Sequence, residues 1–205
     1  MKDREVLRIE PPLNTISEQG VSWTFPKNAL FMKYGVHAGE SIESIIDRKK
    51  KEIEACGYAF WGYGGTLCHP QTQLKPFLEA ASSTREDVYA LFMKTPSRFD
   101  GNTYECSEFS HDKSTWNRIP NSLSVIGSRY ALVIDSLEIV DLRVSPSGYR
   151  IAVGPSKGKP LHEYLRGRVD KACATLFESE PIICDDEPAY EVSLLGKVTD
   201  AVFVR

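Results

Sequence analysis

The spacing of apolar and polar residues along the chain predicts short strands separated by helices. Apolar runs of strand length occupy residues 29–34, 58–63 and 88–94, and the last run is apolar on both alternating faces, as a central strand is. Between the first two runs, apolar residues recur at helical spacing and predict a helix that ends near Gly57. These residues are Ile42, Ile45, Ile46, Ile53 and Cys56.

The rest of the chain continues the same mixed pattern. The other expected elements are a strand at 6–9, a helical patch at 70–83 that contains Pro76, a long strand or a hairpin at 129–144 pinched near Asp135 and Ser136, a strand at 149–153, a helix that starts at Pro160, and two short strands at 190–195 and 201–204. The apolar stripe of the helix after Pro160 comprises Leu161, Leu165, Val169, Ala172, Cys173 and Leu176.

These elements predict an α+β fold, or a mixed α/β fold, in which a mixed β-sheet is flanked by two or three helices. We expect a single globular domain over residues 1–205. Residues 97–127 show neither helical nor strand spacing, so they are expected to be a long loop or a lid-like segment, unless they contain elements that the pattern does not reveal.

The composition is that of an ordinary globular chain. With 41% apolar and 26% charged residues, the sequence lies outside the collagen-like, low-complexity and disordered classes. Its longest apolar run, at 88–93, is far shorter than the roughly 18 residues needed to cross a bilayer. A cytoplasmic protein without membrane contact is therefore expected. Five cysteines without paired spacing indicate reduced thiols.

Charge is distributed unevenly along the chain. The net charge of −3 argues against a protein that binds a long track of nucleic acid. Residues 143–171 nevertheless contain seven basic and two acidic residues, whereas residues 178–191 contain six acidic residues and no basic one. Both stretches fit solvated surfaces. The sharper interpretation is that the basic stretch contains a compact site for one phosphorylated small molecule.

A glycine- and lysine-rich turn at 154–160 is the first candidate site. It lies between an expected strand and an expected helix, where unpaired N–H groups and the helix dipole favour a phosphate. Lys157 and Lys159 would add positive charge. The turn does not match the phosphate loop of nucleotide-hydrolysing enzymes, because Pro160 stands where that motif needs a residue with a hydroxyl group. The alternative is an exposed connector.

An aromatic strand followed by glycines at 58–66 is the second candidate site. Alternation along a strand places Trp61 and Tyr63 on one face, opposite Tyr58 and Phe60. One aromatic pair can then pack in the core while the other meets a flat ligand. The alternative is a buried aromatic strand with a glycine-rich turn.

Histidines and cysteines are weaker candidates for chemistry. Cys68, His69, Cys106 and His111 are of zinc-ligand types, but the adjacent Cys68 and His69 lack the gap of about two to four residues that lets a turn present both, so no metal is predicted. His69, His111 and His162 are candidate acids or bases, although no catalytic motif accompanies them. No cofactor is expected.

The combined pattern predicts a small cytosolic protein that senses or sequesters a nucleotide or a nucleotide-derived phosphorylated signal molecule. The expected ligand-binding residues are Trp61 and Tyr63 for stacking, Thr66 and His69 for orienting the ring, Trp116 and Arg118 for closing the site, and Lys157, Lys159 and Arg166 for phosphate.

This function requires the aromatic turn and the lysine turn to open into one cleft. Two other functions stay open: a hydrolase or transferase that acts on a phosphorylated nucleotide-like substrate, with His69, His111 or His162 as acid or base, and a reader of RNA or of a modified base. The sequence also leaves a homo-oligomer open.

Overall fold

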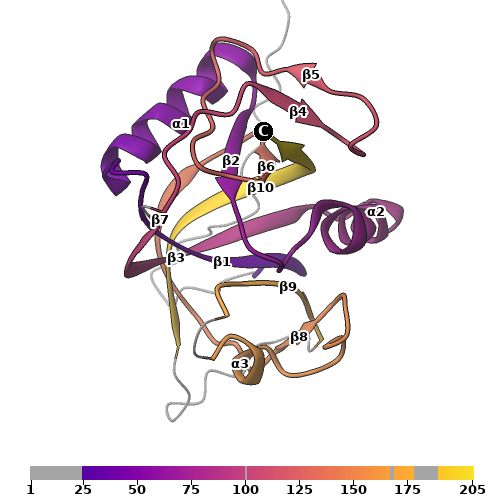
Figure 1. The fold of residues 1–205 in the computed structure, drawn as a ribbon. Coiled ribbons are helices and arrows are strands. Elements are labelled where there is room, and N and C mark those ends of the chain that lie inside the picture. Colours follow the sequence, from indigo (N-terminus) through magenta and orange to yellow (C-terminus); the bar gives the residue numbers. More distant parts are fainter. Residues whose placement is uncertain (1–24, 100, 167–168, 178–188) are drawn as a thin grey trace, which may run out of the picture.

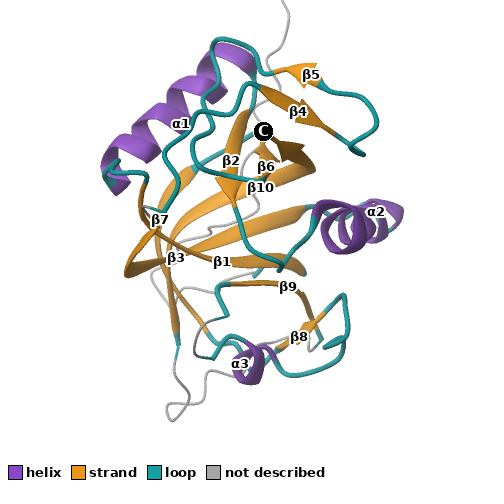
Figure 2. Ribbon diagram, viewed as in Figure 1, coloured by secondary structure: helices purple, strands orange, loops and turns teal. Residues whose placement is uncertain are grey.

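The computed structural model describes residues 25–99, 101–166, 169–177 and 189–205. Within these residues the chain forms one mixed β-sheet of ten strands with helices packed on it (Figures 1 and 2). In chain order the elements are β1 (Asn28–His37), α1 (Ile42–Cys56), β2 (Ala59–Tyr63), the π-helical turn η1 (Pro70–Leu74), α2 (Lys75–Ser83), β3 (Val88–Phe99), β4 (Glu108–Ser110), β5 (Asn117–Arg118), β6 (Tyr130–Ile134), β7 (Glu138–Val144), β8 (Tyr149–Ile151), α3 (Leu161–Tyr164), β9 (Lys171–Leu176) and β10 (Tyr190–Val204). The strand expected at 6–9 lies outside the described residues, as does most of the acidic stretch at 178–191.

The strands follow the order β2-β6-β10-β3-β1-β9-β8 across the sheet. β1 and β3 run parallel, and the other neighbours in this order are antiparallel. A parallel pair needs a crossover connection, and here α1, β2 and α2 supply it. β10 has 15 residues and pairs with β7 and β4 in addition to β3 and β6.

The central strands are apolar without interruption because both faces of the sheet are buried. On β1, Leu30 and Met32 pack into one cluster with side chains of α1 and α2. The alternate residues Ala29 and Phe31 pack into a second cluster on the other face, with side chains from β7, β8 and α3. Successive side chains of a strand thus point alternately into two separate cores, one on each face of the sheet.

Helix α1 confirms the prediction made from the spacing of its isoleucines. The Ser41 side chain accepts a hydrogen bond from the Ser44 N–H and caps the N-terminus. Gly57, at φ 81°, takes the left-handed conformation at the C-terminus, and its N–H bonds the Ile53 carbonyl. The predicted helical patch at 70–83 is also present, as η1 and α2.

The prediction of a long helix after Pro160 is wrong. Only Leu161–Tyr164 is helical, and Lys171–Leu176 forms strand β9 between β1 and β8. Cys173 faces the first core cluster, while Ala172 and Ala174 face the second. A strand buried on both faces leaves a continuous apolar run, which short windows do not distinguish from a helical stripe.

Two further expectations change in the second half of the chain. The two short strands expected at 190–195 and 201–204 are one strand, β10, which continues through a register shift between Val198 and Asp200. Residues 129–144 break into β6 and β7, but these strands do not form a hairpin. Both pair with β10 instead, so they lie along the same neighbour in succession.

The segment 97–127 is partly ordered into the sheet. Its first residues belong to β3, and β4 and β5 form a small antiparallel pair (Figure 1). Side chains from the segment also build a third core cluster against β2, β6 and β10, and these are Cys106, Ile119, Leu123 and Val125. Short strands of two or three residues are too brief to show a period in the sequence.

The described chain is therefore dominated by one mixed sheet, which agrees with the α+β expectation in its coarse form. Helices α1 and α2 pack on the same core cluster, and α3 is a single turn. Among the described residues, no helix is long and apolar enough to cross a membrane.

Candidate functional site

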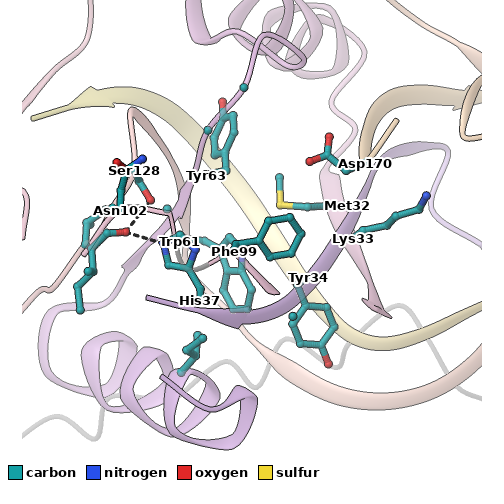
Figure 3. A pocket seen from close by; sticks show the side chains of 18 of the residues that line it. Met32, Lys33, Tyr34, His37, Trp61, Tyr63, Phe99, Asn102, Ser128 and Asp170 are labelled. Atoms are coloured by element: carbon teal, nitrogen blue, oxygen red, sulfur yellow. Dashed lines mark hydrogen bonds between the residues drawn. The ribbon is translucent and has the colours of Figure 1, made fainter. Parts of the chain in front are cut away.

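A pocket of about 340 Å³ lies between α1, the ends of β1 and β2, and three connecting segments (Figure 3). The connecting segments are 99–102, 124–128 and 170–171, with Asp100 outside the described residues. The parts that form the walls are thus far apart in sequence. The walls divide into an aromatic floor, a basic corner and a polar wall.

Aromatic side chains form the floor of the pocket. Trp61 and Tyr63 reach it from β2, and Tyr34 and Phe99 reach it from β1 and β3. As predicted, Trp61 and Tyr63 share one face of β2, while Phe60 points into the third core cluster on the other face.

Hydrogen bonds fix the orientation of the two tyrosines on this floor. The Tyr63 hydroxyl donates to the Cys68 carbonyl at 2.6 Å, and the Tyr34 hydroxyl lies 2.8 Å from Ser193 Oγ. Burial raises the pKa of Tyr63 and of Tyr34 above the ordinary value, so both stay neutral at physiological pH. The floor is therefore a largely apolar surface on which both tyrosine hydroxyls are already bonded.

A basic corner adjoins the floor. Lys171, which is only 5% exposed, donates to Asp170 Oδ2 at 2.7 Å, and its Nζ lies 5.8 Å from the centre of the Tyr63 ring. Lys33 donates to the Val169 carbonyl at 3.0 Å. Gly65, at φ 82°, brings the turn after β2 close to the same ammonium group, since a Cβ there would lie 3.9 Å from Lys171 Nζ. The corner thus holds two ammonium groups and one carboxylate.

Charged residues of α1 hold the segment 124–128, which contains the polar wall, in place. Lys49 Nζ donates to both carboxylate oxygens of Glu52, at 3.0 and 2.8 Å, and to the Ser124 carbonyl at 2.6 Å. Arg48 also donates to Glu52 and to the Ser124 carbonyl. Burial lowers the pKa of Lys49 to about 8, against the opposing effect of Glu52. Because all three N–H groups of Lys49 are bonded, its role here is structural.

The polar wall is formed by residues 126–128 and His37. His37 Nε2 lies 2.7 Å from the Ile126 carbonyl, and Ser128 Oγ donates to the same oxygen at 2.9 Å (Figure 3). A carbonyl only accepts, so Nε2 of His37 carries a proton. Gly62 allows this close packing, because a Cβ there would lie 2.3 Å from Ser128 Oγ.

The aromatic half of the sequence-based site divides in the structure. Trp61 and Tyr63 line the pocket, whereas Thr66 and His69 do not. The His69 ring packs between Tyr130 and Phe203, with ring centres 5.3 Å apart in both cases. Burial, and to a lesser degree the charge of Lys113, lowers the pKa of His69.

The other predicted residues also lie outside the pocket lining. Trp116 packs under the Arg205 guanidinium at 4.0 Å, and Arg118 is exposed on β5. Lys157, Lys159 and Arg166 are exposed. The lysine turn and the segment after β2 do approach each other, because a Cβ on Gly154 would lie 3.0 Å from Gln73 Nε2.

Hydrogen bonds already occupy three backbone N–H groups of the lysine turn. The N–H groups of Lys157, Gly158 and Lys159 bond the carbonyls of Gly154, Ile151 and Ser156, respectively. The helix that follows is one turn long, so it has no extended dipole. The turn therefore has fewer N–H groups available for an anion than the sequence suggests.

The weaker chemical candidates are scattered. His111 Nδ1 lies 2.9 Å from Asp200 Oδ2, and His162 lies 4.0 Å from Glu163. Across the described ranges, no three histidine, cysteine or acidic side chains are placed to hold a metal ion. Of the four residues of zinc-ligand type, Cys68 contacts Cys173, and Cys106 lies against the Ser128 carbonyl.

Sequence reasoning missed the pocket residues outside β2. No pattern in the sequence assigns a role to His37, and Lys171 is there only one of the seven basic residues in the stretch 143–171. The isolated charge of Lys171 at the start of an otherwise apolar run, 171–174, was an available signal, because charged residues in such runs are buried with a partner. No comparable local signal marks His37.

Comparison of the chain with models of protein families, with curated proteins and with solved structures finds no match.

Proposed function

We propose that the chain is a small cytosolic protein whose pocket binds a nucleotide or a nucleotide-derived phosphorylated molecule. One observation carries the proposal: the rings of Trp61 and Tyr63 border the same cavity as the buried ammonium of Lys171. A flat ring and an anionic group on one small molecule match these two surfaces. Each base that stacks on an aromatic side chain contributes about 1–3 kcal/mol.

The charges in the pocket favour an anion. Among the described residues, its lining contains the basic residues Lys33, Arg48, Lys49 and Lys171 and one acidic residue, Asp170. Glutamates pair with Arg48 and Lys49 and neutralise them. The ammonium groups of Lys33 and Lys171 share the single carboxylate of Asp170, which pairs with Lys171, so this corner keeps one net positive charge for a ligand. With Asp170 beside them, these two groups suit a single phosphate better than a di- or triphosphate.

The size of the pocket agrees with a ligand that carries one base. A volume of about 340 Å³ lies at the small end of the range of roughly 300–1,000 Å³ for ligand pockets. A mononucleotide or a cyclic mononucleotide is therefore favoured over a dinucleotide. We assign the phosphate to the ammonium groups of Lys33 and Lys171 in the basic corner and the edge of the base to the polar wall that contains Ser128. Lys33 and Ser128 lie at opposite ends of the rings in Figure 3.

Binding without turnover is favoured over catalysis. The histidines proposed as acids or bases, His69, His111 and His162, do not line the pocket. His37 does, and because its Nε2 proton is engaged by the Ile126 carbonyl, only Nδ1 of this ring could accept a proton. We therefore expect a bound nucleotide to be recovered chemically unchanged after long incubation.

Isothermal titration with nucleosides, nucleoside monophosphates, cyclic mononucleotides and cyclic dinucleotides tests the proposal. We expect one single-phosphate member to bind with a Kd below 1 mM, and Lys171→Met to weaken that binding by about tenfold or more, as the loss of a charged hydrogen bond does. The matched control is Lys157→Ala with Lys159→Ala, in the exposed turn, which leaves the Kd unchanged. The proposal is abandoned if no mononucleotide binds, or if Lys171→Met folds normally and binds like the parent.

A further inference from the structure

Two buried thiols touch each other directly behind the pocket. Cys68 Sγ and Cys173 Sγ lie 3.8 Å apart, although the residues are 105 positions apart in the chain. Both side chains are buried, at 3% and 2% exposure, and both belong to the first core cluster. The two cysteines belong to different parts of the fold, since Cys68 lies in the turn after β2 and Cys173 lies on β9.

Both cysteines are coupled to walls of the pocket. The Cys68 carbonyl accepts a hydrogen bond from the Tyr63 hydroxyl, and Tyr63 forms part of the aromatic floor. Cys173 follows Lys171 by two residues on β9, so the two side chains share a face of the strand. A covalent bond between the two sulfurs would therefore tie the turn that contains Gly65 to the strand that contains Lys171.

The other described cysteines have different neighbours. Cys56 Sγ lies 2.8 Å from Ser122 Oγ, and Cys106 Sγ lies 3.5 Å from the Ser128 carbonyl. Among the described residues, Cys68 and Cys173 are thus the pair of thiols in contact. The sequence alone does not predict this contact, because the cysteines have no paired spacing.

We propose that Cys68 and Cys173 form a reversible disulfide when the protein meets a hydroperoxide. One thiol loses its proton and attacks the peroxide oxygen, which gives a sulfenic acid and hydroxide. The second thiol then attacks the sulfenic sulfur and displaces water. In total, two S–H bonds break, one S–S bond forms, and hydrogen peroxide is reduced to two molecules of water.

Geometry and chemistry set the conditions for this reaction. A disulfide has an S–S bond of about 2.05 Å, so side-chain rotation must bring the sulfurs nearer than their present van der Waals contact. The hydrogen-bond contact with Cys68 and, after it, burial raise the pKa of Cys173. The thiolate is therefore scarce at neutral pH, and oxidation is slow and faster in mild alkali. Hydrogen peroxide is small enough to reach sulfurs that bulkier disulfide reagents do not reach.

The test measures the covalent bond itself and needs no ligand. Fully reduced, folded protein is incubated with hydrogen peroxide at pH 8, its remaining thiols are alkylated, and its peptides are mapped without reduction. We expect a mass loss of about 2 Da and a linked peptide pair that joins Cys68 to Cys173, both reversed by dithiothreitol. We also expect the Tm of the oxidised protein to rise by about 5–15 °C, because the bond closes a loop of about a hundred residues.

Two variants control the assignment. Cys106→Ala removes another buried thiol and still forms the linked peptide, whereas Cys173→Ala does not. The inference is overturned if Cys68 and Cys173 stay reduced while other thiols are oxidised, or if they are oxidised singly to sulfinic acids without a link. It is equally overturned if the linked peptide appears only after unfolding in urea. None of these results bears on nucleotide binding, which is measured separately.

Discussion

Glu52 shows how one buried carboxylate can hold a whole wall of the pocket. It is only 3% exposed and lies between Arg48 and Lys49 on α1. It also accepts the Ser124 N–H at 3.2 Å, so the helix and the segment 124–128 meet at this group. Lys49 is equally buried, and without Glu52 its charge would have no carboxylate partner at contact distance.

We expect Glu52→Ala to lower the free energy of unfolding by about 3 kcal/mol, because it leaves a buried ammonium unpaired. Urea denaturation at pH 7 measures this loss. Glu54→Ala is the matched control, since Glu54 is an exposed carboxylate on the same helix and its loss should change stability by less than about 0.5 kcal/mol. Equal losses for the two variants would contradict the structural role of Glu52.

His69 gives a pH dependence whose sign follows from its environment. Burial lowers its pKa in the folded protein below the ordinary value of 6.5, so the unfolded chain binds more protons in that range. Stability contributed by neutral His69 is therefore lost as the pH falls through 6.5. We expect the Tm of the parent to drop more between pH 7.5 and 5.5 than that of His69→Phe, whose ring keeps the contacts with Tyr130 and Phe203. An identical drop in both proteins would show that His69 does not titrate as proposed.

At the scale of elements, the segment 124–128 is shaped by one glycine. Gly127 has φ 59°, and a Cβ there would lie 2.1 Å from the Asn102 carbonyl oxygen. The backbone of this wall therefore approaches the segment 101–102 more closely than any other residue type allows.

We expect Gly127→Ala to destabilise the protein by about 2 kcal/mol or more and to weaken ligand binding, because the wall must move to admit the Cβ. Gly158→Ala is the control, since Gly158 has φ 85° but open space around it, and its cost is limited to backbone strain of about 1 kcal/mol. Thermal unfolding and titration of both variants provide the comparison. The interpretation fails if Gly158→Ala is the more damaging of the two.

The elements that could be predicted from the sequence are those whose information is local. Helix α1 has its apolar stripe, its Ser41 cap and its terminal Gly57 within one segment. Strand β9 differs from the helix predicted there because both of its faces are buried, by the two core clusters that other parts of the chain form. The site divides in the same way: alternation on β2 placed Trp61 and Tyr63 together, but no spacing relates them to Lys171 or His37.

At the scale of the whole molecule, the sheet is most strongly held along its centre. β1, β3 and β10 are each paired on both sides, whereas β5 pairs only with β4 through two residues. Strands bonded on both sides open only when a large part of the sheet opens.

Amide hydrogen exchange should follow this order. We expect the slowest exchange at 88–92 of β3, 30–32 of β1 and 194–198 of β10, and fast exchange in β5 and α3. Mass spectrometry of peptic fragments distinguishes these regions. Faster exchange in β10 than in β5 would contradict the observed strand order.

The position of β10 has a consequence for biosynthesis. Ribosomes extend a chain at about 5–20 residues per second, so β3 waits several seconds or more after its own synthesis before its partner β10 emerges. During that interval β3 and β6 each present an unsatisfied backbone edge, which is a template for pairing with another nascent polypeptide. Translational pausing ahead of the codons for β10 would prolong this exposure and lower the yield of native protein.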